Sequence, residues 1–261
     1  MDLGLAGVAA AVAGASRGLG YAIAMQLAQE GARVAICSRS RGDSERAASA
    51  IASATGVDVE GFEADVATAA GAESFVSAAA ERFGGLQVLV TNAGGPPAGP
   101  VTDFDDDDWM KAIDLNLMSA VRMVRAALPH LQANPWSRVL LITSTAVKQP
   151  IANLGLSNSV RAATTGFAKT LAGEVGAAGT TVNCILPGLI LTDRLRSLAG
   201  APPDAGPDHP ALAEIARRSP LGRVGTPEEF ASVAAFFCSS RSSFVHGVSL
   251  QVDGGSTKAL L

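Results

Sequence analysis

Aromatic residues and long hydrophobic runs are scarce in this chain. Aromatic residues make up 5% of the 261 residues, although 48% are hydrophobic. The core must therefore consist of Ala, Val, Leu and Ile, which suits helices packed closely on a parallel sheet. No apolar run reaches about 18 residues, so we expect no membrane-spanning helix. The length is sufficient for one large α/β domain.

The sequence holds only three cysteines and three histidines. Each cysteine lies in an apolar segment, which favours buried free thiols in a reducing compartment over a disulfide framework. No histidine is spaced for metal binding with an acid or a second histidine, so we predict no metal. The cysteines are Cys37, Cys184 and Cys238.

Charge argues against nucleic acid as a partner, and the apolar start of the chain is no secretory signal. The formal net charge is −4 and no block of basic residues occurs, which disfavours nucleic-acid binding. Residues 4–15 resemble the core of a secretory signal, but Asp2 rather than a basic residue precedes them. They also lead directly into a glycine-rich turn, so we expect a cytoplasmic protein.

Short apolar runs alternate with helical stretches along the chain. The runs expected to form strands are Val8–Ala13, Arg33–Cys37, Val57–Glu63, Leu86–Thr91, Val139–Thr143, Thr181–Ile185 and Ser249–Val252. The stretches expected to form helices are Leu19–Glu30, Ser44–Thr55, Ala69–Phe83, Asp106–Leu131, Ser157–Val175 and Pro227–Ser239. Seven strands with helical crossovers predict a doubly wound parallel sheet flanked by helices. Residues 1–261 show no domain boundary and are predicted to form one domain.

One long stretch, Asp193–Leu221, fits neither pattern. It holds five prolines and follows a predicted strand, so it should lie above the carboxyl ends of the strands, where doubly wound folds bind ligands. A loop of this length in a compact fold is usually functional. We predict a substrate lid, and a disordered insertion is the alternative.

A glycine-rich turn joins the first predicted strand to the first predicted helix. Glycines let the backbone turn sharply and approach a pyrophosphate, whose charge the free N–H groups and dipole of the helix N-terminus stabilise. The alternative is a tight turn without a ligand, but its place between strand and helix favours dinucleotide binding. The residues predicted to bind the dinucleotide here are Gly14, Ser16, Arg17, Gly18, Leu19 and Gly20.

The end of the second predicted strand indicates which nicotinamide cofactor is bound. An acidic residue there would hold the ribose 2′-hydroxyl of NAD, but residues 36–41 contain no acid. Arg39 and Arg17 are placed to clamp a 2′-phosphate, and Ser38 to hydrogen-bond it. We therefore predict NADP(H) in preference to NAD(H). The alternative is that both arginines are solvated surface charges.

Together with the glycine turn, several motifs in the same order resemble the short-chain dehydrogenases/reductases over essentially the whole chain. These motifs are Ala64–Val66, Thr91–Gly94, Asn116, Ser144, Pro187–Thr192 and Val252–Gly255. Within that family, the 3-oxoacyl-carrier-protein reductases and the sugar or small-alcohol dehydrogenases are most similar in length and in the Gly-Leu-Gly turn. Ala13 stands where the family usually has Thr.

The resemblance implies one Rossmann-type domain that transfers hydride between nicotinamide and a small carbonyl or alcohol substrate. It also implies a homo-oligomer, commonly a tetramer and otherwise a dimer. Asn116 and Ser144 match active-site residues of the family. Cofactor contacts are implied for Asp65, Val66, Asn92, Ala93, Gly94, Pro187, Gly188, Ile190 and Thr192.

The resemblance fails at the catalytic pair. The family has a Tyr about thirteen residues after the Ser and a Lys four residues later, and these positions hold Ser157 and Arg161. The only tyrosine is Tyr21, in the first predicted helix. A serine hydroxyl is a far weaker acid than a phenol, whose pKa is about 10. Arg161 keeps the positive charge for ribose hydroxyls, but it cannot relay a proton.

Other groups are candidates for the proton transfer. Ser144 is a good donor to a carbonyl oxygen. We prefer a water chain through Asn116 and Ser157 as the proton route. Lys148 is a second candidate if it faces a cleft near Arg161, whereas an exposed loop lysine is the alternative.

The altered pair leaves three functions open. The first is an NADP(H)-dependent oxidoreductase with an atypical proton relay. The second is an NADP(H)-binding protein with weak or no dehydrogenase activity, serving as a sensor or inactive subunit, and the third is non-redox chemistry on the same fold. Small apolar residues in Gly95–Pro100 and in the predicted lid suggest a modest apolar carbonyl compound as substrate.

Overall fold

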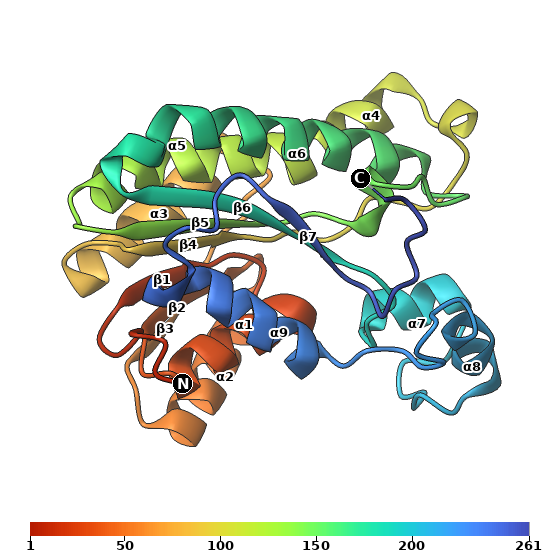
Figure 1. Cartoon of the computed structure of the whole chain (residues 1–261), viewed down its shortest axis with the longest axis horizontal. Helices are drawn as coiled ribbons and strands as arrows, with labels where there is room; N and C mark the ends of the chain where they lie inside the picture. The colour runs from red at the N-terminus through yellow and green to blue at the C-terminus, as the bar shows by residue number, and fades with distance from the viewer. Residues whose placement is uncertain (261) are drawn as a thin grey trace.

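The computed structural model describes residues 1–260, which form a seven-stranded parallel sheet (Figure 1). The strands are β1 (Ala9–Val12), β2 (Arg33–Ser38), β3 (Val59–Glu63), β4 (Val88–Thr91), β5 (Ser137–Ile142), β6 (Thr180–Pro187) and β7 (Ser249–Val252). Their order across the sheet is β3-β2-β1-β4-β5-β6-β7. The order reverses between β1 and β4, where the carboxyl ends of a doubly wound sheet leave room for a ligand. The predicted fold is confirmed.

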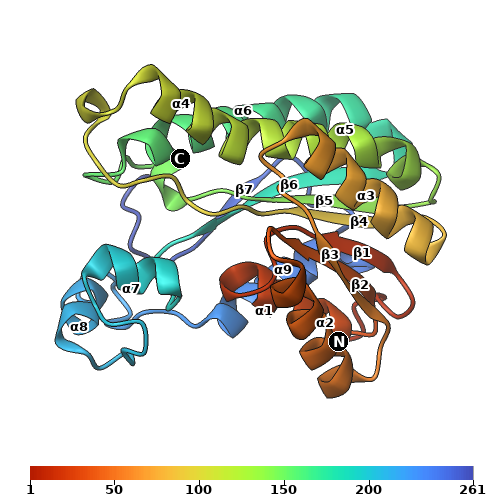
Figure 2. The ribbon, with the colours of Figure 1, turned by 180° about the vertical axis from the view of Figure 1, so that it is seen from behind.

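Helices cover both faces of the sheet, as the two opposite views show (Figures 1 and 2). One face carries α1 (Gly18–Gln29), α2 (Arg41–Thr55) and α9 (Pro227–Cys238). The other carries α3 (Ala69–Phe83), α5 (Ser119–Gln132) and α6 (Gly155–Val175). In β1, Ala9 and Ala11 pack toward the second layer, whereas Ala10 and Val12 pack toward the first. Small side chains on β1 therefore let both helix layers approach closely, as the composition predicts.

The predicted helix Asp106–Leu131 is not continuous. It consists of α4 (Asp106–Ile113), a π-helical turn over Asp114–Met118, and α5. The π turn widens the backbone ladder, and the carbonyl of Asn116 accepts a hydrogen bond from Thr164 Oγ1 of α6 at 2.9 Å. The interruption thus depends on a tertiary contact, and single π turns of this kind occur often at functional sites.

The stretch 193–221 is folded, so the alternative of a disordered insertion is wrong. It contains α7 (Asp193–Ala199) and α8 (Pro210–Ala216), which lie beyond the carboxyl end of β6 (Figure 1). Leu195, Leu212 and Val224 form a small apolar cluster under these helices. Leu195 N donates to Thr192 Oγ1 at 3.3 Å, which caps α7. The position agrees with the predicted lid.

The structure also shows the state of the cysteines and whether membrane-spanning helices or metal-binding clusters are present. All three cysteines are buried and free. Across residues 1–260, no helix is long and apolar enough to cross a membrane. The same residues contain no cluster of three or more His, Cys, Asp or Glu side chains suited to a metal ion.

Candidate active site

The glycine turn takes a shape that side chains would obstruct. Gly14 and Gly18 have φ angles of 58° and 60°, in the left-handed region that favours glycine. A Cβ on Gly20 would lie 2.4 Å from the Gly14 carbonyl oxygen. Asn92 Nδ2 braces the turn from the end of β4, because it donates to the carbonyl oxygens of Ala13 and Gly14 at 3.2 and 3.0 Å. Asn92 therefore connects the ends of the two strands that flank the switch point.

The backbone of Gly18 is open on the side that faces the segment after β6. A Cβ on Gly18 would meet only Thr192, at 3.9 Å. Nearby, the Arg17 guanidinium lies 3.9 Å from the carboxylate of Asp193. The N-terminus of α1 thus lies opposite Thr192, and the N–H groups of a helix N-terminus are the groups that bind a pyrophosphate.

The segment Pro187–Thr192 is held in place by the end of β7, by Asp253 just after it and by Gly225 before α9. Gly188 N donates to Val252 O at 3.1 Å, and a Cβ on Gly188 would lie 2.3 Å from Asp253 Cβ. Leu191 N donates to Gly225 O at 2.9 Å. The resemblance places Pro187, Gly188, Ile190 and Thr192 at the nicotinamide, and the structure brings this segment opposite the glycine turn.

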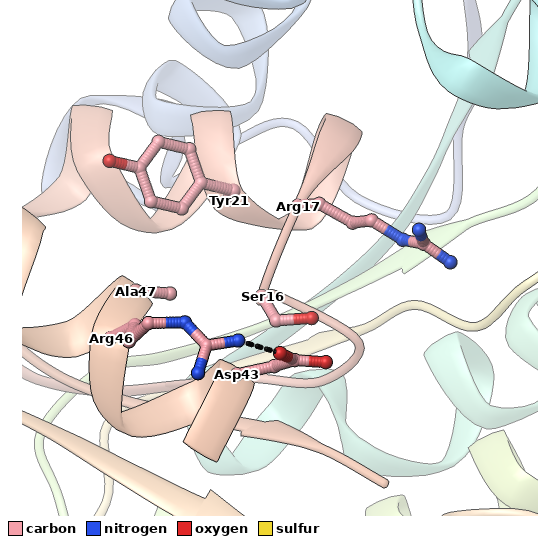
Figure 3. A pocket seen from close by; sticks show the side chains of 6 residues that line it. All are labelled: Ser16, Arg17, Tyr21, Asp43, Arg46 and Ala47. Carbon is pink, nitrogen blue, oxygen red and sulfur yellow. Dashed lines mark hydrogen bonds and ion pairs between the residues drawn. The ribbon is translucent and has the colours of Figure 1, made fainter. Parts of the chain in front are cut away.

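A pocket of about 360 Å³ opens between the glycine turn and α2. Ser16, Tyr21, Asp43 and Arg46 line it, and Asp43 and Arg46 form an ion pair in front of Ser16 (Figure 3). The Arg17 side chain extends away from that pair. These positions suit the adenosine end of a dinucleotide, since they surround the first turn of α1.

Two of the residues predicted to bind a 2′-phosphate, Ser38 and Arg39, differ in whether their donor groups are already hydrogen-bonded. Ser38 Oγ donates to Ser40 O at 2.8 Å, so its hydroxyl proton is already used. Arg39 is exposed beside it. At the next strand end, Val66 is buried and Asp65 is exposed, with Asp65 Oδ1 accepting from Ala67 N at 3.1 Å. Arg39 and Asp65 therefore remain available to a ligand at this edge.

Ser144 lies two residues beyond the carboxyl end of β5. Its Oγ accepts a hydrogen bond from Ala146 N at 3.1 Å, so its own proton remains free to donate to a substrate oxygen. Lys148 ends the short 3₁₀ turn that follows, and it is partly exposed. Ser157, in the first turns of α6, is 6% exposed, and its hydroxyl has no hydrogen-bond partner among residues 1–260. Two serine hydroxyls are thus free to donate.

Asn116 occupies the π turn and is buried. Its Nδ2 donates to Gly94 O at 2.9 Å, which ties it to the loop after β4. Its carbonyl oxygen accepts from Thr164, whereas its Oδ1 is buried without a partner among the described residues. Since an unpaired buried acceptor is costly, Oδ1 is a site for a bound water or ligand donor.

Arg161 extends from α6 to the end of β5. Its Nη1 donates to Ile142 O and Thr143 O, both at 3.0 Å. Burial, reinforced by the positive charge of Arg194, lowers the pKa of Arg161 to about 10. Arg161 therefore stays charged at neutral pH and holds the backbone just before Ser144, but it is no proton donor.

Comparison with known proteins identifies the family. The family model described as enoyl-(acyl carrier protein) reductase matches residues 14–257. The rabbit (Oryctolagus cuniculus) dehydrogenase/reductase SDR family member 4 is 34% identical, with 98% of this chain and 96% of the relative covered. The chain belongs to the short-chain dehydrogenase/reductase family.

Two further proteins indicate its place among the short-chain dehydrogenases/reductases. The 3-oxoacyl-[acyl-carrier-protein] reductase of Pseudomonas aeruginosa is 34% identical, with 97% of this chain and 98% of the relative covered. The crystal structure of L-sorbose reductase from Gluconobacter frateurii, complexed with NADPH and L-sorbose, is 33% identical and covers both chains completely, with a TM-score of 0.92.

In this short-chain dehydrogenase/reductase, sequence reasoning missed the residues of α2 that line the pocket. The predicted helix began at Ser44, but α2 begins at Arg41 because Ser40 Oγ accepts from Asp43 N at 3.3 Å. A serine followed three residues later by an acid is a helix-start signal. Applied to Ser40, this signal would have started the helix at Arg41 and put Asp43 in its first turn; only the folded structure brings that turn to the pocket.

Proposed function

We propose that this protein is an NADP(H)-dependent oxidoreductase that transfers hydride between nicotinamide and a small carbonyl or alcohol substrate, with an atypical proton relay. The open backbone of Gly18 at the start of α1 carries the proposal. A Cβ at Gly20 would clash with the Gly14 carbonyl oxygen. Glycine at this position therefore preserves the tight turn on which a pyrophosphate would bind. Bound nicotinamide would supply or accept the hydride, and NADPH is present in the similar L-sorbose reductase.

Positive charge at the adenosine end favours NADP(H) over NAD(H). Ser38 stands at the end of β2, where NAD-binding proteins carry an acid. Arg17 and Arg39 are exposed on either side, and Arg46 lies in the pocket with Asp43. Asp43 is neutralised by Arg46 and is therefore a weak competitor of a 2′-phosphate.

The proton side of the reaction depends on three groups. Ser144 would donate a hydrogen bond to the substrate oxygen, because its Oγ accepts from Ala146 N while its hydroxyl proton has no acceptor among the described residues. Ser157 would orient the substrate or a water, and water held at Asn116 Oδ1 would connect it to solvent. The backbone carbonyl of Asn116 already accepts a hydrogen bond from Thr164 Oγ1, so the proposed route uses the side-chain oxygen of Asn116.

The second candidate function is an NADP(H)-binding protein with weak or no dehydrogenase activity. One observation favours it: neither Ser157 nor Arg161 is an acid of suitable strength at the place where the family has Tyr and Lys. NADPH fluorescence titration followed by turnover on a panel of carbonyl compounds separates the two functions. Tight binding without turnover would favour the second, and absence of NADPH binding would refute both.

Variants test the route and the cofactor. Lys148→Ala should leave turnover nearly unchanged. If this variant loses its turnover, Lys148 rather than the water chain supplies the proton. Arg39→Ala and Arg17→Ala should lower affinity for NADPH more than for NADH. Arg125→Ala is a matched control, because Arg125 pairs with Glu73 in α3, on the opposite layer. Equal losses for both cofactors would refute the NADP(H) assignment.

A further inference from the structure

The residues after β7 connect the lid to the loop after β5. The chain leaves β7, turns near α7 and then runs toward α6 (Figures 1 and 2). On this path it first meets the lid, where Ser219 Oγ donates to Gly254 O at 3.0 Å. It then meets the loop after β5, where Lys258 N donates to Gln149 Oε1 at 3.0 Å. Residues 253–258 therefore contact two segments that lie far apart in the sequence.

The contact with the lid is closely packed. Ser219 is buried, and its Oγ also accepts a hydrogen bond from Leu221 N at 3.3 Å. A Cβ on Gly254 would lie 2.5 Å from that Oγ, and a Cβ on Gly255 would lie 3.3 Å from Pro220 Cγ. The two glycines have φ angles of 61° and 80°, in the left-handed region that disfavours side chains. Glycine at both positions therefore lets the chain turn directly against the end of the lid.

The carboxylate of Asp253 fixes the course of the chain between the two contacts. It accepts hydrogen bonds from Gly255 N at 2.9 Å, Thr257 N at 2.8 Å and Ser256 Oγ at 3.2 Å. Burial favours the neutral acid, but these hydrogen bonds outweigh it and lower the pKa of Asp253. On its other side Asp253 packs against Gly188, where a Cβ would lie 2.3 Å from Asp253 Cβ. The segment is thus an ordered turn with a fixed start.

The contact with the loop after β5 is easier to break. Gln149 and Lys258 are both exposed, and one hydrogen bond joins them. The backbone of Gln149 is held separately, since its N–H donates to Thr145 O at 3.2 Å. Because an exposed hydrogen bond contributes little to stability, this contact opens and recloses without unfolding of the domain.

We propose that residues 253–258 form a strap that couples the lid to the loop after β5, and that the lid loosens when the Gln149 contact is released. Ser219 is the point at which the strap holds the lid, and the turn at Asp253 carries the displacement from one contact to the other. A lid that loosens in this way gives a small molecule a route to Ser144. The inference goes beyond the proposed function, because it concerns how the lid is held and applies whether or not the protein transfers hydride.

Hydrogen exchange of the whole protein, measured by mass spectrometry, tests the coupling. No hydrogen bond within residues 1–260 joins Gln149 to the lid, so Gln149→Ala reaches the lid through the strap. We expect exchange to rise about two- to tenfold in peptides of both 145–153 and 193–221, as for the loss of one hydrogen bond. Gln149→Glu keeps an acceptor and should restore the wild-type exchange in both. Gln132→Ala is the matched control, because Gln132 is exposed at the end of α5.

Deletion of residues 256–261 is a second test, because it removes the strap beyond the glycine turn. It should raise exchange in the lid at least as much as Gln149→Ala does, while peptides of β1 and α1 keep their rates. Unchanged exchange in 193–221 in both variants overturns the proposal, whatever happens in 145–153. A rise throughout the protein, β1 included, assigns the segment to the stability of the whole fold and also overturns it. NADPH titration of the wild type tests the proposed function separately, since its failure leaves the exchange result standing.

Discussion

Replacing Ser157 with Tyr and Arg161 with Lys should raise carbonyl reduction strongly. The phenol would stand at the position of a hydroxyl that has no partner, and the lysine would reach the carbonyls of Ile142 and Thr143 that now bind Arg161. A lysine ammonium has three donors and is small, so it can bind a carbonyl and still face the phenol. The change would introduce the Tyr-x-x-x-Lys spacing that the resemblance to the family implies for this helix.

The size of the effect follows from acid strength. A water-like hydroxyl has a pKa of about 15.7 and a phenol one of about 10, a difference of roughly 6 units. If half of that difference in pKa appears as a lower barrier for proton transfer, the rate rises about 10³-fold. This lies within the range of about 10²- to 10⁴-fold for general acid catalysis. Ser157 is only 6% exposed, so the added ring should cost about 1–3 kcal/mol of stability.

The assay is NADPH oxidation at saturating carbonyl substrate, with kcat as the readout. Ser157→Phe with Arg161→Lys is the matched control, because it fills the same space without the acidic hydroxyl. Thermal melting and NADPH titration confirm that each variant is folded and binds cofactor. If the Tyr variant binds NADPH like the wild type but is no faster than the Phe control, proton donation at Ser157 is not the limiting step.

Three other predictions concern the framework. Gly20→Ala should weaken NADPH binding at least about tenfold and lower the melting temperature, because its Cβ would lie 2.4 Å from Gly14 O and overpack the turn. Arg223 and the N–H of Thr226 hold the pKa of Glu229 at about 2, below its ordinary 4.5. The stability that Glu229→Gln removes should therefore be present above pH 4.5 and vanish as pH falls toward 2 in urea titrations. Thiol reagents should label no cysteine of the native protein, because burial raises these thiol pKa values to about 11 or 12. The cysteines are Cys37, Cys184 and Cys238.

Each of these predictions has a contrary result. Unchanged NADPH affinity in Gly20→Ala, with Gly166→Ala as the control at an open helical position, would mean that the turn does not contact the cofactor. A stability difference for Glu229→Gln that persists below pH 2 would show that the ion pair is not its source. Labelling of the folded protein at mildly alkaline pH would show that a thiol is accessible.

Most of the fold was predictable because its signals are local. Alternation of apolar runs with helical stretches located all seven strands, and the glycine spacing located the first crossover. The boundaries were less predictable where a cap or a long-range bond decides them. Ser40 extended α2 by one turn, and the hydrogen bond from Thr164 accompanies the π turn at Asn116.

The residues proposed for the candidate site could be named from motif spacing, whereas their arrangement could not. Motif spacing located Ser144, Ser157 and Arg161 on the chain. It could not show that the Ser144 proton is free or that Ser157 lacks a partner, because both depend on which groups surround the side chains after folding. The same holds for Arg194, whose contacts lie in the loop after β4.

By itself, the sequence determined the doubly wound sheet and the glycine turn at its switch point, and it led to the prediction that Ser157 and Arg161 stand at the positions of the family's Tyr and Lys. These features depend on period, backbone freedom and residue identity, which are properties of short segments. Only the tertiary structure decided that Arg161 donates to the carbonyls of Ile142 and Thr143, and that Arg194 reaches the loop after β4. Charges interact through space rather than along the chain, so their environment exists only once α7 has folded over the end of the sheet.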